Sequence, residues 1–331
     1  MFEGKKVLIT GGTGSLGHAL TKKILEMGVD TIRIFSRDEL KQSQMNSEFM
    51  DKRLRFLLGD VRDKERLSRA LEDINIVILT AALKRIEAAE YNPFESIKTN
   101  VYGSQNLIET CLDRDVESVI AIGTDKAVSP LNTYGATKLL MEKMFVAANF
   151  YKGTHYNTKF SCVRYGNVLG SRGSLVPTMI ERIKEGKSVT ITDPKMTRFN
   201  ITMNQALDLI FRGLSEGIGG DIFIPKLKAY RVEDMKDAII DLMGKNPEIE
   251  KIPVRPGEKF HETLINKDES RNVYESKNDY IIFDKMTQNY NYDGIPNVKK
   301  SNISEQYSSD NVKLLSKEEL KMILVNEKLI S

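Results

Sequence analysis

Residues that commonly bind transition metals or form disulfides are scarce in this sequence, which has two cysteines and three histidines among its 331 residues. Cys111 and Cys162 both lie inside apolar segments, so we expect two reduced core thiols rather than a disulfide or a nucleophile. With so few thiolate and imidazole ligands, we expect no metal site.

The chain also has little excess charge of either sign. The formal net charge is +3, and no basic run is interleaved with aromatic residues, so the sequence does not indicate nucleic-acid binding. No apolar run is long enough to cross a membrane, and the N-terminal stretch MFEGKKVLITGG lacks the apolar core of a signal peptide. We therefore expect a cytoplasmic protein with no membrane segment.

The first half of the chain alternates short apolar runs with segments of helical periodicity. The runs are rich in β-branched residues and are bounded by turn residues, as strands are. Strands that are almost entirely apolar are buried on both faces, which is typical of a parallel sheet covered by helices. The pattern therefore predicts an α/β fold with a doubly wound, Rossmann-like parallel sheet. The predicted strands are 6–10, 31–36, 54–60, 74–82 and 116–124, and the clearest helices are 15–27 and 95–113.

The alternation becomes irregular in the second half of the chain. Gly, Pro and Arg gather in 164–177 and 254–262, which we interpret as long functional loops. We therefore divide the chain into an NADP-binding domain that carries the catalytic residues (1–165), a smaller, irregular α/β substrate-binding region with some strands returning to the main sheet (166–284), and a C-terminal arm with a short helix (285–331).

The arm begins with a polar segment, 285–310, that carries scattered apolar side chains. These would be exposed unless the segment packs on the body or on a partner subunit, so we expect it to pack. A helix is predicted at 316–327, where Ser316 and Glu319 form the pattern of a capping box. The apolar residues in question are Tyr290, Tyr292, Ile295 and Ile303.

The stretch ITGGTGSLG follows the first predicted strand and opens a helix. Gly11 permits the tight turn, Gly14 lets the backbone approach a pyrophosphate, and Gly17 lets the helix pack closely on the strand. The N-terminus of the helix then faces the phosphates, so the loop predicts a dinucleotide site. The other residues expected to contact the dinucleotide in this loop are Thr13, Ser15 and Leu16.

The end of the second predicted strand bears on which dinucleotide is bound. A site for NAD usually places a carboxylate there, on the ribose 2′-hydroxyl. This sequence has Ser36 and Arg37 instead, with Lys41 one helical turn later. A hydroxyl and two cations suit a 2′-phosphate, which favours NADP over NAD. Asp60 and Val61, at the end of the third strand, are placed to contact the adenine.

A tyrosine and a lysine are spaced four residues apart on a helix predicted to begin near Asn132. Tyr134 and Lys138 therefore lie on one face of that helix. A neighbouring cation lowers the pKa of a tyrosine because it favours the phenolate, so the pair suits hydride-transfer chemistry. Asp125 and Lys126 lie a few residues upstream, and a simple oxidation needs neither of them.

Motifs along nearly the whole chain resemble the extended short-chain dehydrogenase/reductases. They are TGGTGSLG, AALK, TN, TDKA, YGATK, RYGNV, SRGS, MTRF, RPGEKFHE and YSSDN. Within that family, the combination of TDK, SRGS and RPGEK is similar to the soluble inverting UDP-N-acetylglucosamine 4,6-dehydratases of flagellin-glycan and capsule pathways. The resemblance implies a homo-oligomeric lyase that acts on a UDP-sugar and uses NADP without net redox change.

The resemblance also implies a role for each residue of the central motif. Tyr134, supported by Thr124, takes the proton of the carbon-4 hydroxyl while NADP⁺ accepts the hydride. Lys126 then removes the proton on carbon 5, Asp125 protonates the leaving carbon-6 hydroxyl, and the hydride returns to carbon 6. A neutral lysine next to other cations is a plausible base when it is partly desolvated.

Further residues are assigned by their place in these motifs. Ala81, Ala82, Tyr134 and Lys138 are expected to contact the cofactor. Lys84 and Asn100 are expected on its nicotinamide side, and Glu258 is expected to bind the uridine ribose. The residues expected to bind the UDP-sugar, with arginines for its diphosphate, are Lys84, Asn167, Arg172, Ser174, Arg198, Arg255 and Glu258.

The sequence departs from this pattern in two places and leaves other interpretations open. Gly123 stands where serine is common, and Arg85 and Glu87 stand where relatives tend to carry His and Pro. A UDP-sugar 4-epimerase would use Tyr134 and Lys138 without the Asp-Lys pair. A non-enzymatic dinucleotide sensor would often lack the tyrosine that this chain keeps. A retaining 4,6-dehydratase would preserve the configuration at carbon 5, but such relatives often carry N-terminal membrane-spanning segments.

Overall fold

The computed structural model describes residues 1–171, 173–283 and 297–330. Its centre is a ten-stranded sheet within these residues, composed of β1 (Lys6–Thr10), β2 (Thr31–Ser36), β3 (Leu54–Leu58), β4 (Ile76–Leu79), β5 (Ser118–Ile122), β6 (Lys159–Val163), β9 (Asp221–Pro225), β13 (Val273–Glu275), β14 (Asp279–Phe283) and β15 (Lys299–Lys300). The spatial order is β15-β13-β14-β9-β6-β5-β4-β1-β2-β3. Neighbouring strands run parallel from β3 to β9, and β14, β13 and β15 add an antiparallel edge.

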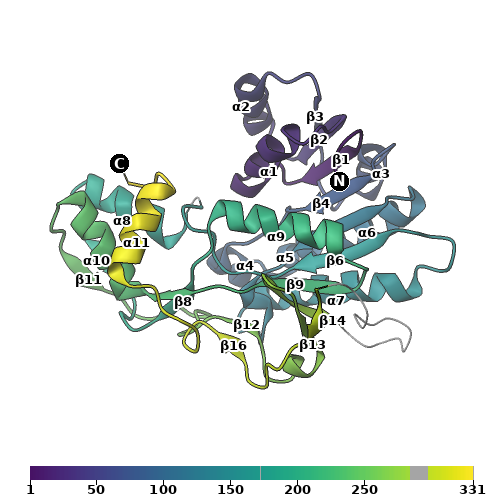
Figure 1. Ribbon diagram of the computed structural model, residues 1–331. Helices are drawn as coiled ribbons and strands as arrows, with labels where there is room; N and C mark the ends of the chain where they lie inside the picture. Colours follow the sequence, from purple (N-terminus) through teal and green to yellow (C-terminus); the bar gives the residue numbers. More distant parts are fainter. Residues whose placement is uncertain (172, 284–296, 331) are drawn as a thin grey trace.

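Helices cover both faces of this sheet, which confirms the predicted doubly wound fold (Figure 1). Side chains alternate along a strand, so that in β1 Leu8 belongs to one core and Val7 and Ile9 belong to the other. The core of Leu8 is closed by α3 (Lys64–Ala70), α6 (Gly103–Asp113) and α7 (Thr133–Tyr151). The opposite core is closed by α1 (Ser15–Leu25), α2 (Glu39–Phe49) and α9 (Met203–Glu216).

The helix predicted at 95–113 is interrupted in the structure. Two short helices, α4 (Ile86–Tyr91) and α5 (Pro93–Ile97), lead into a π-helical turn, η1 (Lys98–Tyr102), before α6 begins. Inside this turn the side chain of Asn100 bonds to Leu83 and Thr137 rather than to its own helix. The interruption therefore anchors the chain that follows β4 to helix α7.

A smaller body of helices stands away from the sheet, at the left of Figure 1. It contains α8 (Leu175–Lys184), α10 (Val232–Met243) and α11 (Lys317–Asn326), with the parallel pair β7 (Val189–Ile191) and β11 (Ile249–Lys251). The three helices and β7 share a separate apolar core. The capping box predicted at the last helix is confirmed, because Ser316 and Glu319 bond reciprocally at the start of α11.

Two small antiparallel sheets connect the bodies: β8 (Thr197–Phe199) with β10 (Ala229–Arg231), and β12 (Thr263–Ile265) with β16 (Tyr307–Ser308). Short 3₁₀ turns follow β5 at η2 (Asp125–Ala127) and precede β13 at η3 (Glu269–Asn272). The described part of the predicted arm packs on the body, since Ile303 contacts the main core and Tyr307 is buried. Tyr290, Tyr292 and Ile295 lie outside the described residues.

Candidate active site

A cavity of about 830 Å³ lies along the carboxyl ends of the parallel strands. It runs past the point where the strand order reverses, between β1 and β4, which is where doubly wound sheets bind ligands. Of the residues predicted to contact a cofactor, those that line this cavity are Gly11, Thr13, Gly14, Ser15, Leu16, Gly17, Ser36, Arg37, Lys41, Asp60, Val61, Ala81, Ala82, Lys84, Tyr134 and Lys138. Asn100 does not line it.

The glycine loop has the geometry that a pyrophosphate requires. Gly11 has a φ of +65°, in the left-handed region, and a Cβ there would meet the backbone of Ala81 at 2.9 Å. A Cβ on Gly17 would lie 2.4 Å from the backbone of Gly12, so only glycine lets α1 approach the strand end this closely. Gly14 is the N-cap residue of α1, whose first turn carries no acidic side chain. The free N–H groups of α1 therefore face a cavity of the right size for a nicotinamide dinucleotide.

Arg37 and Lys41 reach the cavity where the adenosine ribose would lie. Arg37 is largely exposed, and its Nη1 lies 3.5 Å from Asp60 Oδ2. Lys41 Nζ lies 2.7 Å from Oδ2 of Asp38, the residue that caps α2. Each cation is thus matched with a carboxylate, and a 2′-phosphate would have to compete with Asp60 and Asp38. Ser36 accepts a hydrogen bond from Gln42 at 3.0 Å.

Asn100 lies behind the residues that line the cavity. It is buried, accepts from the backbone N–H of Leu83 at 2.9 Å, and donates to the Leu83 carbonyl and to Thr137 Oγ1, each at 3.0 Å. Through these bonds the Asn100 side chain joins Leu83, which precedes Lys84, to Thr137 of α7. Burial lowers the pKa of Lys84, which itself lines the cavity.

Tyr134 and Lys138 lie in the first two turns of α7, which Asn132 caps by accepting from the backbone N–H of Gly135 at 2.8 Å. The expectation that Lys138 lowers the pKa of Tyr134 is wrong for the protein alone. Burial raises the pKa of Tyr134 to about 12, and the cation that opposes this is Lys126. Burial also lowers the pKa of Lys138 to about 8, so this lysine loses its proton more readily than an exposed lysine does.

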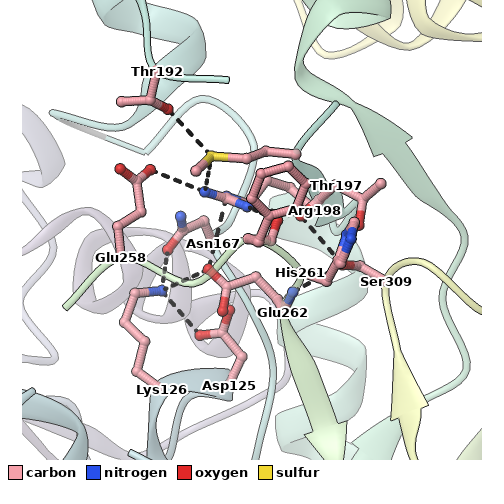
Figure 2. Close-up of polar contacts among 12 residues, drawn as sticks. Asp125, Lys126, Asn167, Thr192, Thr197, Arg198, Glu258, His261, Glu262 and Ser309 are labelled. Atoms are coloured by element: carbon pink, nitrogen blue, oxygen red, sulfur yellow. Dashed lines mark hydrogen bonds and ion pairs between the residues drawn. The ribbon is translucent and has the colours of Figure 1, made fainter. Parts of the chain in front are cut away.

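The Asp-Lys pair lies in the 3₁₀ turn at the end of β5. Asp125 is buried, accepts from Thr124 Oγ1 at 2.8 Å, and lies 3.1 Å from Lys126 Nζ. The ammonium of Lys126 also donates to Asn167 Oδ1 at 3.3 Å. Asn167 follows β6, the strand next to β5. Figure 2 shows Lys126 pointing between these partners.

Two carboxylates, those of Asp125 and Glu262, lie within 4 Å of the Lys126 ammonium, and the cation Lys259 also interacts with it. Glu262 Oε1 lies 3.9 Å from Lys126 Nζ, on the same side of the ammonium as Asp125 (Figure 2). Burial alone would lower the pKa of Lys126, but Asp125 and Glu262 outweigh it and hold that pKa above its ordinary value. Burial of Asp125 is likewise outweighed by Lys126, Glu262 and Thr124, which keep the pKa of that carboxyl low.

Glu262 is the residue of this cluster that the sequence reasoning missed. It belongs to the RPGEKFHE stretch, where Arg255 and Glu258 were assigned and Glu262 was not. A carboxylate just before a short strand gives no local signal of its own. Its position next to Lys126 results from the packing of β12 against the 3₁₀ turn that follows β5.

The predicted substrate residues separate into two groups. Asn167 and Lys84 line the cavity, whereas Arg198, Arg255, Glu258 and Ser174 do not. Arg198 is buried beyond Lys126, with its Nη2 3.0 Å from Glu258 Oε1 and its Nε 3.7 Å from Glu262 Oε1.

The remaining predicted substrate residues lie on loops and at a helix end. Arg255 is exposed, with its Nη1 3.8 Å from Glu87 Oε1. Ser174 occupies the N-cap position of α8. Arg172 lies outside the described residues.

Two further properties concern metals and membranes. Within 1–171, 173–283 and 297–330, no group of three or more His, Cys, Asp or Glu side chains is arranged to hold a metal ion. Cys111 and Cys162 are buried free thiols.

Among the helices in the described part of the chain, none has the length and apolar character needed to cross a membrane.

A dinucleotide cavity built on a doubly wound sheet, with a Tyr-Lys helix along its edge, defines an extended short-chain dehydrogenase/reductase. The chain belongs to the polysaccharide biosynthesis protein family, whose profile matches residues 7–284.

Similar proteins include both dehydratases and epimerases of nucleotide sugars. The chain is 47% identical over 284 residues to the UDP-N-acetylglucosamine 4,6-dehydratase (inverting) of Campylobacter jejuni, covering 85% of this chain and 84% of that protein. It is 38% identical over 330 residues to the UDP-glucose 4-epimerase of Rickettsia rickettsii, covering 98% and 96%. A Methanocaldococcus jannaschii protein named "Uncharacterized membrane protein MJ1061" is 43% identical over 330 residues, covering 98% and 96%. The solved structure of Pen from Bacillus thuringiensis matches the whole of both chains with a TM-score of 0.93 and 37% identity.

Proposed function

We propose that this protein is a UDP-N-acetylglucosamine 4,6-dehydratase that uses NADP and inverts carbon 5. The observation that carries the proposal is the Asp125–Lys126 pair, which lies at the same strand end as Thr124 and beside the Tyr134–Lys138 helix. An oxidation alone would need only the second pair, whereas elimination of water needs an additional base and acid. The 47% identity to a Campylobacter jejuni enzyme of this name supports the same substrate and stereochemistry.

The first half-reaction oxidises carbon 4. Bound NADP⁺ would supply the hydride acceptor for this step and return the hydride at the end. Tyr134 accepts the proton of the carbon-4 hydroxyl, and Thr124, which also lines the cavity, orients that hydroxyl. Because burial disfavours the phenolate, Tyr134 depends on the positive charge of Lys126 during this step.

The second half-reaction removes water across carbons 5 and 6. The 4-keto group acidifies the proton on carbon 5, which Lys126 removes as an amine. Asp125 donates a proton to the carbon-6 hydroxyl, which leaves as water. The short contact of 3.1 Å between Lys126 Nζ and Asp125 Oδ1 allows the proton to pass from the ammonium to the carboxylate before the step.

The preference for NADP rests on Arg37 and Lys41, which border the cavity together. A 2′-phosphate carries more charge than the carboxylates that these cations now contact, and charge-assisted bonds to phosphate are strong. NAD remains the alternative because Asp38 and Asp60 could accept from a ribose 2′-hydroxyl.

The test is to incubate the protein with UDP-N-acetylglucosamine in deuterated water and to follow the sugar by NMR. A 4,6-dehydratase yields a 4-keto-6-deoxy sugar with deuterium on carbon 5, and the ring couplings report whether that carbon has inverted. A product that keeps its carbon-6 hydroxyl and differs only at carbon 4 would contradict the proposal. That outcome would favour a 4-epimerase, the second candidate, which the 38% identity to a Rickettsia rickettsii epimerase supports.

A further inference from the structure

Helix α2 buries an amide on the side that faces the sheet. Its two buried residues are Gln42 and Met45, and Gln42 is only 5% exposed. Burial of an amide costs free energy unless its polar atoms find hydrogen-bond partners. The partners of Gln42 lie at the edge of the sheet, where α2 packs on β2 and β3.

The amide nitrogen of Gln42 donates to the ends of two neighbouring strands. Nε2 lies 3.1 Å from the Ser36 carbonyl oxygen, 3.0 Å from Ser36 Oγ and 2.9 Å from the Leu57 carbonyl oxygen. Two of these three atoms are carbonyl oxygens, which only accept, so the amide must present its NH₂ group to them. These contacts therefore fix which end of the Gln42 amide faces Ser36.

The Ser36 hydroxyl can only accept from Gln42, because the group that faces it is a donor. Its own hydrogen must then point elsewhere, and the hydrogen bonds of the described residues include none in which Ser36 Oγ donates. Ser36 is 8% exposed and lines the dinucleotide cavity. The hydroxyl hydrogen is therefore available to an acceptor inside that cavity.

Ser36 differs in this respect from the two cations beside it. Arg37 Nη1 lies 3.5 Å from Asp60 Oδ2, and Lys41 Nζ lies 2.7 Å from Asp38 Oδ2. A 2′-phosphate must compete with a carboxylate for each cation, whereas the structure shows no competing acceptor for the Ser36 hydroxyl among the residues it describes. A hydrogen bond to an ionised acceptor is also stronger than one between neutral groups.

We propose that Gln42 is a positioning residue that strengthens the preference for NADP by holding the Ser36 hydroxyl as a donor toward the ribose 2′-position. The inference rests on the NADP preference in the proposed function and adds to it a residue that does not itself line the cavity. A 2′-phosphate offers charged oxygens to this hydroxyl, whereas the 2′-hydroxyl of NAD offers a weaker, neutral acceptor. Gln42 thus acts on cofactor choice through Ser36.

The test measures NADP⁺ and NAD⁺ binding to the full chain and to its Gln42→Met variant by isothermal titration calorimetry. Methionine is similar in length but cannot donate. The carbonyls of Ser36 and Leu57 then lose their side-chain donor, and the Ser36 hydroxyl is free to turn toward them. NADP⁺ binding should weaken by about threefold to tenfold, with little change for NAD⁺. An unchanged ratio of the two affinities overturns the proposal.

A double-mutant cycle with Ser36→Ala separates positioning from a merely structural role of the amide. Ser36→Ala alone should weaken NADP⁺ binding by about tenfold. In that background Gln42→Met should have little further effect on the ratio, because the hydroxyl that Gln42 directs is absent. If Gln42→Met has the same effect with and without the hydroxyl, the amide acts by another route and the proposal is wrong.

Gln42→Glu tests the same bond in a second way, since a carboxylate has the shape of the amide but accepts instead of donating. The Ser36 hydroxyl should then donate to the new carboxylate, and the ratio should fall at least as far as in Gln42→Met. The part of this effect that remains in the Ser36→Ala background is due to the added charge alone.

Gln44 provides the matched controls, because it is an exposed glutamine on the same helix. Gln44→Met and Gln44→Glu make the same changes of side chain away from Ser36, so both should leave the ratio unchanged. Circular dichroism of each variant shows whether it is folded before binding is measured. An effect of the Gln44 variants as large as that of the Gln42 variants would overturn the assignment to Gln42.

The binding data also distinguish this inference from the proposed function, because no measurement uses the sugar. If the wild type binds both cofactors equally but the cycle still couples Gln42 to Ser36 in NADP⁺ binding, the NADP preference fails and the positioning role stands. If the wild type prefers NADP⁺ but the cycle shows no coupling, the preference stands and the role of Gln42 is refuted.

Discussion

Gly123 lies directly against the buried carboxylate of Glu142. A Cβ at position 123 would lie 2.4 Å from Glu142 Oε1 and 2.6 Å from the carbonyl oxygen of Val163. Glu142 cannot easily retreat, because Arg164, also buried, contacts its Oε2 at 2.7 Å. Related sequences tend to carry serine at this position. Gly123 therefore leaves the space that Glu142 occupies in its ion pair with Arg164.

Gly123→Ser should destabilise the protein. The added atoms must displace Glu142 from Arg164 or shift the end of β5, and overpacking of this kind costs about 1–3 kcal/mol. Urea unfolding followed by circular dichroism would measure the loss. Gly166→Ala is the control, since an added Cβ there meets nothing closer than 3.4 Å. Equal stability of Gly123→Ser and the wild type would refute the account of this contact.

Arg37→Ala should narrow the difference between NADP⁺ and NAD⁺ binding. Loss of one charge-assisted contact to the 2′-phosphate should weaken NADP⁺ binding by about 1.5–3 kcal/mol and change NAD⁺ binding little. Isothermal titration calorimetry of both cofactors would measure the effect. Arg69→Ala, which removes an exposed arginine on α3 paired with Glu72, should leave both affinities unchanged. If the wild type binds the two cofactors equally, the preference for NADP is wrong.

Lys126→Ala and Tyr134→Phe should fail at different steps. Without Lys126, oxidation at carbon 4 slows but continues, so reduced nicotinamide should accumulate with no release of keto sugar. Without the Tyr134 hydroxyl, no reduced nicotinamide should form. Absorbance of the reduced cofactor in single turnovers would distinguish the two variants. Near-normal turnover of Lys126→Ala, with deuterium still entering carbon 5, would exclude Lys126 as the base.

Tyr307→Phe should lower the free energy of unfolding. The hydroxyl of this buried tyrosine accepts from the Leu227 N–H at 2.6 Å and lies 3.3 Å from the Pro225 carbonyl. Its removal leaves a poorly solvated N–H without a partner, at a cost of about 1–3 kcal/mol. Tyr91→Phe, at a residue that is 88% exposed, should change the stability by much less. Denaturant titrations of the two variants side by side would decide the matter.

Helices α4, α5 and α7 and the turn η1 expose several large apolar side chains, and we predict that this face joins two copies of the chain. Leu140→Glu, on α7, should dissociate the assembly into monomers, as measured by analytical ultracentrifugation. Met322→Glu, at a residue of similar exposure on α11, should not. A wild-type protein that is monomeric at micromolar concentration would disprove the prediction. The exposed residues are Tyr91, Phe94, Tyr102, Leu140 and Tyr151.

Local patterns predicted the dinucleotide half of the molecule well. Each predicted strand of the first half overlaps a strand of the central sheet, because apolar β-branched runs and glycine turns act over a few residues. The break in the helix predicted at 95–113 was missed. It depends on Asn100 bonding to Leu83 and Thr137, which are distant in sequence, and no local propensity reports such contacts.

The charges around the candidate catalytic residues could not be inferred in the same way. Lys126 and Asp125 were identified from adjacent positions, but the second carboxylate comes from Glu262, far along the chain. The pKa of Tyr134 was expected to fall because a lysine is near in sequence, whereas burial, a property of the folded protein, raises it. Electrostatic environments of this kind depend on tertiary packing and are visible only in the structure.

The pairing of β12 with β16 has a consequence for how the protein matures on the ribosome. The N-terminal part of a chain emerges first and begins to fold as a unit, so the glycine loop and the Tyr134 helix can assemble early. The backbone that fixes Glu262 is completed only by Ser309, close to the end of the chain. A nascent chain could thus complete its dinucleotide cavity before Glu262 is fixed, and premature termination before Ser309 would yield a product with the cavity but without the anchored Glu262.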